Sequence, residues 1–296
     1  MKNMHVQIIA PELARRIQRQ LEADGFQIGS APYALFEAIG SDVRVTYYPK
    51  RKKLLLQGNG TAGLLLRLSD LLGTPVFDES EPDAHRIDRP TIGSDESGKG
   101  DYFGSLVVAG CLAGPEDVSW IRSLGVRDSK EASTHGILRA EGQILDRLET
   151  FVLELDPPEY ERQHLETGNV NVILGRAHAR VITELRGQAA CDRAVVDRFG
   201  NVRYVEEALG AAAEGLTLIQ VPRAEANPAV ACASFLARAA FLRSLARLSD
   251  DVGVDLLPGA SKEVEACARK VVAVGGRELL SKVAKLHFKT TQRVLP

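Results

Sequence analysis

The stretch TIGSDESGKGDYFGSLVVAG, residues 91–110, is the part of the chain from which the rest can be interpreted. It reads as two short strands joined by a glycine-rich turn. Its centre, GSDESGKG (93–100), nearly fits the phosphate-binding pattern of two glycines separated by four residues and followed by Lys and then Ser or Thr. The last position fails, because Gly100 stands where the pattern needs a hydroxyl group. Two adjacent acids, Asp95 and Glu96, lie where the phosphates would sit.

The composition is that of a globular protein long enough to bury a core, with 296 residues, 26% charged and 45% hydrophobic. Residues 1–77 carry ten Lys and Arg against six Asp and Glu, a mildly basic balance that permits a nucleic-acid partner. The four cysteines have no CxxC spacing, and no run is apolar enough for a signal peptide or a membrane span. We therefore expect reduced cysteines, a cytoplasmic location and no membrane partner.

An acidic stretch with two prolines, FDESEPDAHRIDRP (77–90), interrupts the hydrophobic pattern. We expect a first domain at 1–77, a linker at 78–90 and a second domain at 91–296. In the first domain the pattern predicts helices over 11–25 and 62–72 and strands over 33–38, 43–48 and 53–58. In the second it predicts strands over 105–110, 193–197 and 216–221, and helices around 134–152, 171–187, 227–248, 261–274 and 276–284. Strands interleaved with helices indicate an α/β domain with a mixed sheet.

Acidic residues follow several of these strands. Asp95 and Glu96 leave the first strand of the second domain, Asp197 closes RAVVD, and Glu225 lies between a strand and the 227–248 helix. Functional groups of open α/β sheets gather at the carboxyl ends of strands. Two divalent cations can stabilise the charge that develops when a phosphodiester is cleaved, and hard cations prefer oxygen ligands. Taken singly, Asp197 and Glu225 could be ordinary surface acids, whereas the glycine-flanked Asp95–Glu96 pair is less easily explained in that way.

The same segments are similar to those of a known family. GSDESGKGDYFGSLVVAG resembles the signature of bacterial ribonuclease HIII, a type 2 ribonuclease H, and its Lys favours ribonuclease HIII over ribonuclease HII. The resemblance extends in family order over essentially the whole second domain, and residues 1–77 resemble the amino-terminal extension of these enzymes. The similar segments are LGVRDSK (124–130), GNVNVILGRAHA (168–179), VVDRF (195–199), RAEANPAVACASFLAR (223–238), LPGASKEV (257–264) and KLHFK (285–289).

This resemblance implies a ribonuclease H-like mixed-sheet catalytic domain after a small α+β domain that resembles half of a TATA-box-binding protein and binds substrate. It implies a metal-dependent endoribonuclease that hydrolyses the RNA strand of RNA/DNA hybrids with Mg²⁺ or Mn²⁺, two ions per site, and leaves 5′-phosphate and 3′-hydroxyl ends. By the same resemblance the catalytic metal ligands are Asp95, Glu96, Asp197 and Glu225, and the substrate-binding residues are Gly98, Lys99, Gly100, Ser129 and Lys130. Ser105 departs from the family, which usually has proline there.

Several interpretations stay open. A phosphate-loop nucleoside triphosphatase would use Lys99 on phosphates, but Gly100 and the two acids disfavour it. A non-catalytic hybrid-binding protein has no use for four clustered acids. The segment around Ser129 and Lys130 could equally be a capped turn. Phosphate contacts in the first domain, or simply solvated charges, are indicated at Arg15, Arg16, Arg19 and 50–53. Nothing in the composition indicates an oligomer, so we expect a monomer.

Overall fold

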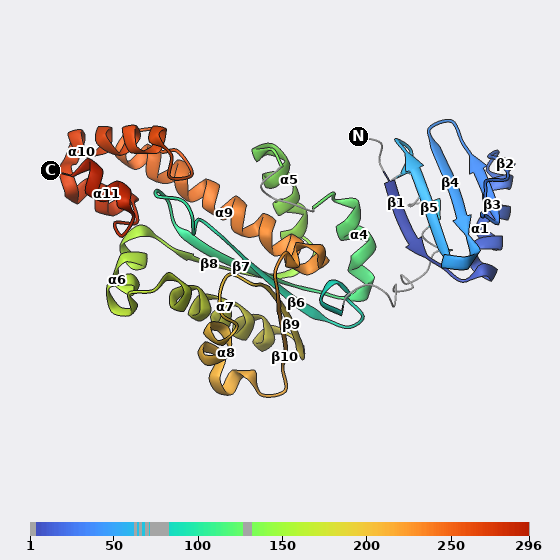
Figure 1. The fold of residues 1–296 in the computed structure, drawn as a ribbon, viewed down its shortest axis with the longest axis horizontal. Coiled ribbons are helices and arrows are strands. Elements are labelled where there is room, and N and C mark those ends of the chain that lie inside the picture. Colours follow the sequence, from blue (N-terminus) through green and yellow to red (C-terminus); the bar gives the residue numbers. More distant parts are fainter. Residues whose placement is uncertain are drawn as a thin grey trace.

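The structure is a computed structural model that describes residues 4–61, 64, 67, 68, 71, 83–126 and 132–295. In this part of the chain the strands form two five-stranded sheets (Figure 1). The strands before residue 60 make the first sheet, and those from residue 91 onward make the second. Both sheets are covered by helices, so the mixed α/β class predicted from the sequence is confirmed. The division at residues 77 and 90 stays a prediction.

The first sheet is antiparallel throughout, and α1 (Pro11–Ala23) packs on one of its faces. Pro11 suits the first turn of α1 because its missing N–H has no partner there in any helix. Ile17 and Leu21 on one side of α1 are buried in the core of this body. The strands, in spatial order, are β1 (Met4–Ile8), β5 (Lys53–Gly58), β4 (Val43–Tyr48), β3 (Phe36–Ile39) and β2 (Gln27–Gly29).

The sequence located most of these elements but not all. The helix over 11–25 and the strands over 43–48 and 53–58 are confirmed. The strand predicted at 33–38 begins at Phe36 instead, because residues 31–34 form a turn in which Tyr33 has a φ of 65°. β1 and β2 were not predicted. The helix predicted over 62–72 lies mostly outside the described residues.

The second sheet is mixed, as predicted. Its spatial order is β10 (Thr217–Val221), β9 (Arg193–Asp197), β6 (Thr91–Ser97), β7 (Leu106–Ala113) and β8 (Glu149–Leu155). β10, β9 and β6 are parallel, whereas β7 is antiparallel to both β6 and β8. The parallel strands at the centre therefore end at the same edge, which positions the acidic residues.

The helix predicted over 134–152 is wrong in its second half. α5 (Thr134–Leu145) ends before Asp146, and residues 149–155 form strand β8. The β8 sequence ETFVLEL contains β-branched and aromatic residues that favour a strand. Because β8 lies at the sheet edge and pairs with β7, more than thirty residues earlier in the chain, its pairing cannot be seen in the local pattern.

Helices cover both faces of the second sheet. Figure 1 shows α9 (Pro228–Val252), α5 and α4 (Val118–Ser123) on one side, and α7 (Val170–Gln188) with α8 (Arg203–Leu209) on the other. Two hydrophobic clusters accordingly fill the two faces. α6 (Pro157–Thr167), α10 (Lys262–Val283) and α11 (Lys289–Val294) complete the body. Short 3₁₀ turns occur at Pro49–Arg51, Asp83–His85, Pro115–Asp117, Gly210–Ala213 and Ala224–Ala226.

Two long helices need comment. α10 contains non-helical backbone at Gly275 and Gly276, and this kink separates the two helices predicted over 261–274 and 276–284. In the described part of the chain, α9 is also the one helix whose length and apolar composition would suit a membrane span. Most of that apolar stretch is buried against the sheet and α5, as in the core helix of a globular domain.

Residues 83–90 pack on the second body. Ile87 is buried in the cluster on the α9 side. Arg193, at the start of β9 and almost fully buried, forms ion pairs with Asp88 at 3.0 Å and with Asp83 at 3.2 Å. The Asn227 side chain donates to the Ala84 carbonyl at 2.9 Å. These bonds fix the chain where it enters β6.

Candidate active site

Three of the predicted acids lie at the ends of two neighbouring strands. Asp95 and Glu96 are in the last half of β6, and Asp197 is the final residue of β9. The strands are parallel and pair Ser94 with Val196, so Asp95 and Asp197 follow at neighbouring positions across the sheet. The backbones of these three acids therefore lie close together, and their convergence into one site stays a prediction.

The strand directs its two acids to opposite faces, because successive side chains of a strand alternate. Gly93 lies against the backbone of α9, so Asp95, two residues later, points to the α9 face. Ser94 hydrogen bonds to His178 of α7, so Glu96 points to the α7 face. The acidic site therefore spans both faces of the strand end.

Asp95 is the acid whose ionisation the fold opposes. Burial raises the pKa of Asp95 to about 7, and the negative charge of Glu96 adds to the rise. Hydrogen bonds from the Ser234 side chain and from the Glu96 backbone N–H, the latter at 2.7 Å, oppose it, and the charge of Asp197 raises it slightly. A positive charge placed beside these groups would favour the ionised carboxylates.

Glu225 reaches the same edge through the segment after β10. β10 pairs Val221 with Asp197, and the following 3₁₀ turn Ala224–Ala226 returns to β9. The Ala224 N–H donates to Asp197 Oδ1 at 3.0 Å, and Glu225 is the next residue. The four predicted acids thus belong to one end of the sheet, and their roles stay a prediction.

As the side chains stand, the described residues contain no group of three His, Cys, Asp or Glu side chains placed to hold one metal ion. In this arrangement Asp197 accepts from the Ala224 N–H, and Glu96 lies against His178. The donor chemistry nevertheless fits a hard divalent cation, because carboxylate oxygens are the ligands that Mg²⁺ and Mn²⁺ prefer. A cation between Asp95 and Asp197 would relieve the repulsion between them.

His178 is a part of the site that the sequence did not reveal. Its ring is fully buried, with Nδ1 2.8 Å from Ser94 Oγ and Nε2 3.3 Å from Glu96 Oε2. The Ser94 hydroxyl donates its hydrogen to the Ala109 carbonyl oxygen at 3.0 Å, and Nε2 faces a carboxylate oxygen of Glu96. The ring stacks on Phe199 with centroids 5.0 Å apart. Only the fold brings these residues together, because the six histidines are dispersed in the sequence.

Ser234 was also missed. It lies in α9 and donates to Asp95. The sequence offers one signal for it, since Ser234 falls within the segment 223–238 that resembles the family. A serine in an alanine-rich helix, however, is by itself no indication of a site. Its contact with Asp95 depends on the close packing of α9 against β6, which Gly93 permits.

The glycine-rich loop after β6 has a backbone that requires glycine at one position. Gly98 has a φ of +90°, and a Cβ there would lie 2.1 Å from the Ser105 carbonyl oxygen. Lys99 donates from Nζ to the Phe199 carbonyl oxygen at 3.1 Å and lies over the Phe199 ring. Space is open beside Gly100. The loop thus places Lys99, and a backbone at Gly100 with open space beside it, next to the residues that follow Asp197.

The connection after this loop contradicts the phosphate-loop alternative. A phosphate-binding loop of that kind joins a strand to the start of a helix, whose N–H groups face the phosphates. Here the loop joins β6 to the antiparallel strand β7, and residues 98–105 contain no helix. Asp101 in this loop accepts a hydrogen bond from the Gly259 N–H at 2.6 Å. The Asp101 carboxylate therefore bonds to backbone.

Two other predicted positions need comment. Ser129 and Lys130 lie outside the described residues. Ser105, which departs from the family's usual proline, is buried and bonds through its hydroxyl to Glu154 at 2.8 Å and to Ser244 at 2.6 Å. A proline could form neither bond, so Ser105 links β7, β8 and α9 directly beneath the glycine-rich loop.

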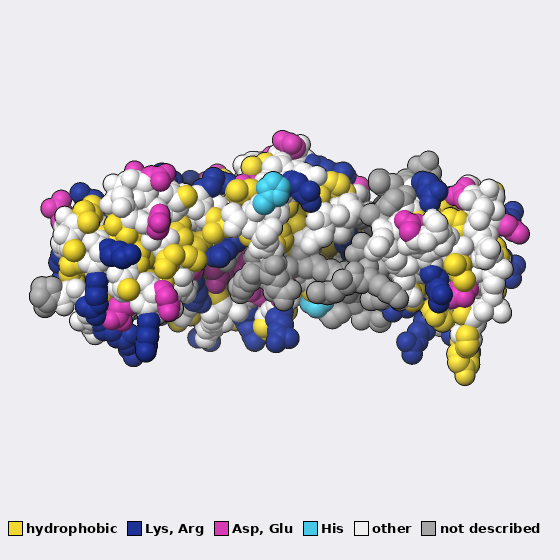
Figure 2. Space-filling model, turned by 90° about the horizontal axis from the view of Figure 1, so that it is seen from above, with side chains coloured by type: hydrophobic (Ala, Val, Ile, Leu, Met, Phe, Trp, Pro, Cys, Tyr) yellow, Lys and Arg dark blue, Asp and Glu magenta, His cyan; other side chains and the backbone are white. Residues whose placement is uncertain are grey.

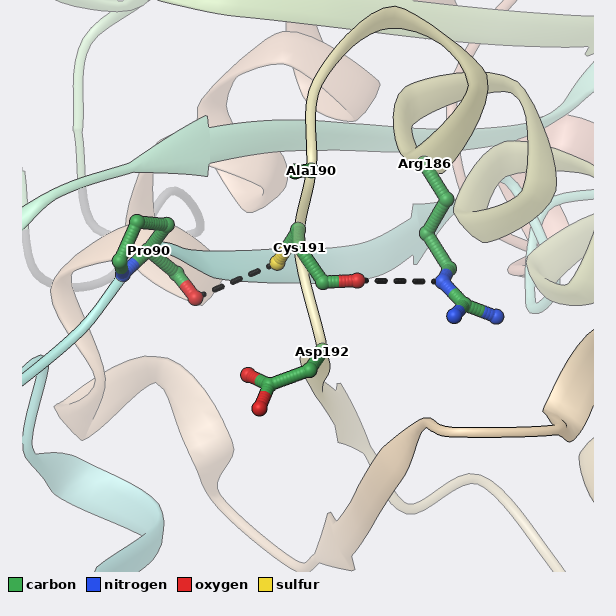
Figure 3. A pocket seen from close by; sticks show the side chains of 5 residues that line it. All are labelled: Pro90, Arg186, Ala190, Cys191 and Asp192. Atoms are coloured by element: carbon green, nitrogen blue, oxygen red, sulfur yellow. Dashed lines mark hydrogen bonds between the residues drawn. The ribbon is translucent and has the colours of Figure 1, made fainter.

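A separate pocket lies at the opposite end of β9 (Figure 3), lined by Pro90, Arg186, Ala190, Cys191 and Asp192. Cys191 Sγ donates to the Pro90 carbonyl oxygen at 3.2 Å, and Arg186 Nε donates to the Cys191 carbonyl oxygen at 3.1 Å. These bonds hold the backbone in place just before β9 begins. The described lining residues include no second acidic cluster, so we assign the chemistry to the other end of the sheet.

The mixed sheet, its central parallel strands and the carboxylates at their ends define a ribonuclease H-like nuclease domain. The glycine-rich loop beside the acids agrees with an enzyme that acts on a nucleic-acid backbone, because small residues permit close approach. Lys99 supplies the positive charge that such a backbone needs.

Comparison with known proteins gives the family. The family model described as Ribonuclease HII matches residues 92–291. Ribonuclease HIII of Protochlamydia amoebophila (strain UWE25) is 33% identical over 284 residues, covering 96% of this chain and 94% of the relative. A crystal structure of Bst-RNase HIII in complex with Mn²⁺ aligns with a TM-score of 0.66 at 27% identity, covering 99% of this chain and 98% of that one. For Aquifex aeolicus RNase H3 the TM-score is 0.58 at 28% identity, covering 96% and 100%.

The chain belongs to the ribonuclease HII family, and its relatives over nearly the full length are ribonucleases HIII. It is a metal-dependent endoribonuclease with ribonuclease H activity on RNA/DNA hybrids. The family suspected from the sequence is therefore confirmed. Family membership also decides against a purely hybrid-binding protein.

Proposed function

We propose that the enzyme cleaves the RNA strand with two divalent cations, Mg²⁺ or Mn²⁺, held by Asp95, Glu96, Asp197 and Glu225. The products are a 5′-phosphate and a 3′-hydroxyl. The observation that carries this proposal is the juxtaposition of Asp95 and Asp197 on parallel strands, with a pKa of Asp95 raised to about 7. The Mn²⁺ complex of Bst-RNase HIII supports a divalent metal in this family.

The bound cations would supply Lewis-acid stabilisation of the phosphoryl oxygens and of the attacking water. The chain's own residues do the rest. Asp95 and Asp197 hold carboxylates on the α9 face, while His178 orients Glu96 from the α7 face. Ser234 holds the Asp95 carboxyl group by a hydrogen bond.

The loop at Gly98, Lys99 and Gly100 recognises the hybrid. An enzyme that distinguishes RNA from DNA must sense the 2′-hydroxyl group. Backbone N–H groups beside glycines can approach a ribose without steric conflict, and the open space beside Gly100 supports this role. Lys99 lies beside the loop after Asp197 and binds a phosphate oxygen as a point charge.

The first body contributes to substrate binding. α1 covers one face of its sheet, whereas the other face carries exposed Arg44 and Gln57 and half-buried Leu55. Lys50, Arg51 and Lys52 are exposed at the turn between β4 and β5. Figure 2 shows Lys and Arg interspersed with Asp and Glu over the visible face rather than forming one continuous patch. We therefore assign hybrid binding by the first body to a few basic contacts.

We also propose that the enzyme is a cytoplasmic monomer.

The test is Asp95→Asn, with Asp192→Asn at the opposite end of β9 as the matched control. Asn keeps the size of Asp95 but removes its charge, so we expect loss of hybrid cleavage and nearly unchanged hybrid binding. Asp192→Asn should cleave as the wild type does. Cleavage is followed on a labelled RNA/DNA hybrid with Mg²⁺ and with Mn²⁺, and the 5′ ends of the products are examined. Normal turnover by Asp95→Asn would refute the metal-site assignment.

A further inference from the structure

Lys285 is an ionisable residue sealed inside the second body. It follows α10, and its side chain has no exposed surface. Within the described part of the chain it forms no ion pair with a carboxylate. A buried amino group needs hydrogen-bond partners, because losing its hydration is costly. Lys285 finds them in the glycine-rich loop, since its Nζ donates to the carbonyl oxygens of Asp101 at 2.9 Å and Gly104 at 2.6 Å.

The backbone beside Lys285 contacts the same loop. The Lys285 N–H donates to the Tyr102 carbonyl oxygen at 2.9 Å, and the Gly104 N–H donates to the Val283 carbonyl oxygen at 3.0 Å. Phe103 forms a β-bridge with Ala284. Consecutive residues of the loop are therefore bonded to three consecutive residues from the carboxyl-terminal part of the chain.

The side chains of the loop are held as well. Tyr102 is fully buried, and its hydroxyl lies 3.0 Å from Thr291 Oγ1 of α11. Asp101 accepts from the Gly259 N–H. On the other side, Lys99 contacts Phe199. The part of the loop that faces α10 and α11 is thus fixed, whereas Lys99 and Gly100 are left to face outward.

We propose that Lys285 is a positioning residue for substrate recognition, which holds residues 101–104 so that Lys99 and Gly100 meet the hybrid in a fixed geometry. The inference rests on the proposed function, because it takes this loop as the part that contacts the hybrid. The Lys285 Nζ donates to two carbonyl groups of the loop, those of Asp101 and Gly104. No acid of the metal site contacts it, so its loss affects binding of the hybrid more than the chemical step.

The experiment measures KM and kcat for hybrid cleavage by Lys285→Met, Lys285→Gln and the control Lys282→Met. Met has nearly the length of Lys but donates no hydrogen bond, and Gln keeps a donor. Lys282 is exposed, pairs with Glu278 and lies in the last turn of α10, shortly before Lys285. We expect KM to rise about tenfold or more in Lys285→Met, since small misplacements of a positioning group are costly, with kcat largely retained. Lys285→Gln should lie between Met and wild type, and Lys282→Met should match wild type.

Measuring KM and kcat separately distinguishes a positioning role of Lys285 from simple destabilisation of the fold. Partial unfolding removes active molecules, which lowers the apparent kcat and leaves KM unchanged, and that result would overturn the inference. Thr291→Val is a milder variant that removes the partner of the Tyr102 hydroxyl. If Lys285→Met does not fold, a rise in KM for Thr291→Val and Lys285→Gln supports the inference, and wild-type KM in both overturns it. A wild-type enzyme inactive on hybrids would instead refute the proposed function.

Discussion

His178 connects the acidic site to the buried interior. Its two ring nitrogens contact Ser94 and Glu96, and its face contacts Phe199. Hydrogen-bond partners of metal-binding carboxylates fix the direction of the ligand. A single ring therefore couples the orientation of Glu96 to the packing of α7 against β6.

We predict that His178→Phe weakens metal binding. Phe keeps the stacked ring but cannot hydrogen bond to Glu96, and loss of such a partner typically lowers metal affinity about 10- to 100-fold. The measurement is Mn²⁺ titration followed by electron paramagnetic resonance, with hybrid cleavage at saturating metal beside it. His135→Phe on the exposed start of α5 is the control. Wild-type Mn²⁺ affinity in His178→Phe would contradict the role given to the ring.

The burial of Lys285 also leads to a prediction about how the stability of the protein depends on pH. Burial lowers the pKa of Lys285 from its ordinary 10.5 to about 7, and the charge of Asp101 opposes the shift. Between these two pH values the unfolded chain binds the proton and the folded chain does not. The free energy of unfolding of the wild type should therefore rise with pH across this window, relative to Lys285→Met. Denaturant unfolding of both proteins at pH 6.5, 8 and 9.5 (chosen to span that range) measures the difference. A difference independent of pH would contradict the shift.

At the scale of elements, the sequence pattern predicted the helices and strands whose hydrophobic periodicity lies within their own residues. α1 and β4 have clear periodicity, and β9 is a short buried run that ends in an acid. The prediction failed for β8, because this edge strand is stabilised by its pairing with β7, which lies far away in the sequence. The positions of the four acids could be foreseen from strand ends and from the family resemblance. Their partners His178 and Ser234 could not, because they depend on which helix packs on which face.

The contact between β6 and α9 allows a test of this packing. A Cβ at Gly93 would lie 2.2 Å from the carbonyl carbon of Ala229, so both backbones would have to separate. We predict that Gly93→Ala lowers the free energy of unfolding by about 1–3 kcal/mol, as overpacking does. Gly142→Ala, in α5 where the added methyl meets no atom within 4 Å, should instead stabilise by about 0.5–1 kcal/mol. Equal stability of the two variants, measured by denaturant unfolding, would contradict the packing argument.

At the scale of the whole molecule, we expect binding of a polyanion to be shared between the two bodies. The basic turn at Lys50, Arg51 and Lys52 belongs to the first, and Lys99 belongs to the second. Each phosphate that the protein neutralises releases counterions, so the salt dependence of binding reports how many phosphates are bound. The contribution of the first body can therefore be measured without separating it from the rest of the chain.

We predict that replacing Lys50, Arg51 and Lys52 with Ala weakens hybrid binding and reduces its salt dependence. The slope of log K against log salt should become shallower by about 0.7–0.9 for each phosphate that the variant no longer binds. A second triple variant, with Ala in place of Arg15, Arg16 and Arg19 on α1, serves as the comparison. The measurement is fluorescence anisotropy with Asp95→Asn protein at several salt concentrations. An unchanged slope in both triple variants would remove the basic contacts assigned to the first body.

The long apolar helix α9 also has a consequence for biosynthesis. Strands β6 and β7 leave the ribosome more than a hundred residues before α9, which later covers one of their faces. Until then the nascent chain exposes that apolar face, and α9 itself emerges as a 25-residue segment that contains a long apolar stretch. Transiently exposed surfaces of this kind aggregate readily. We therefore expect chaperones to bind the newly made chain chiefly before residue 252 has been added and folded into place.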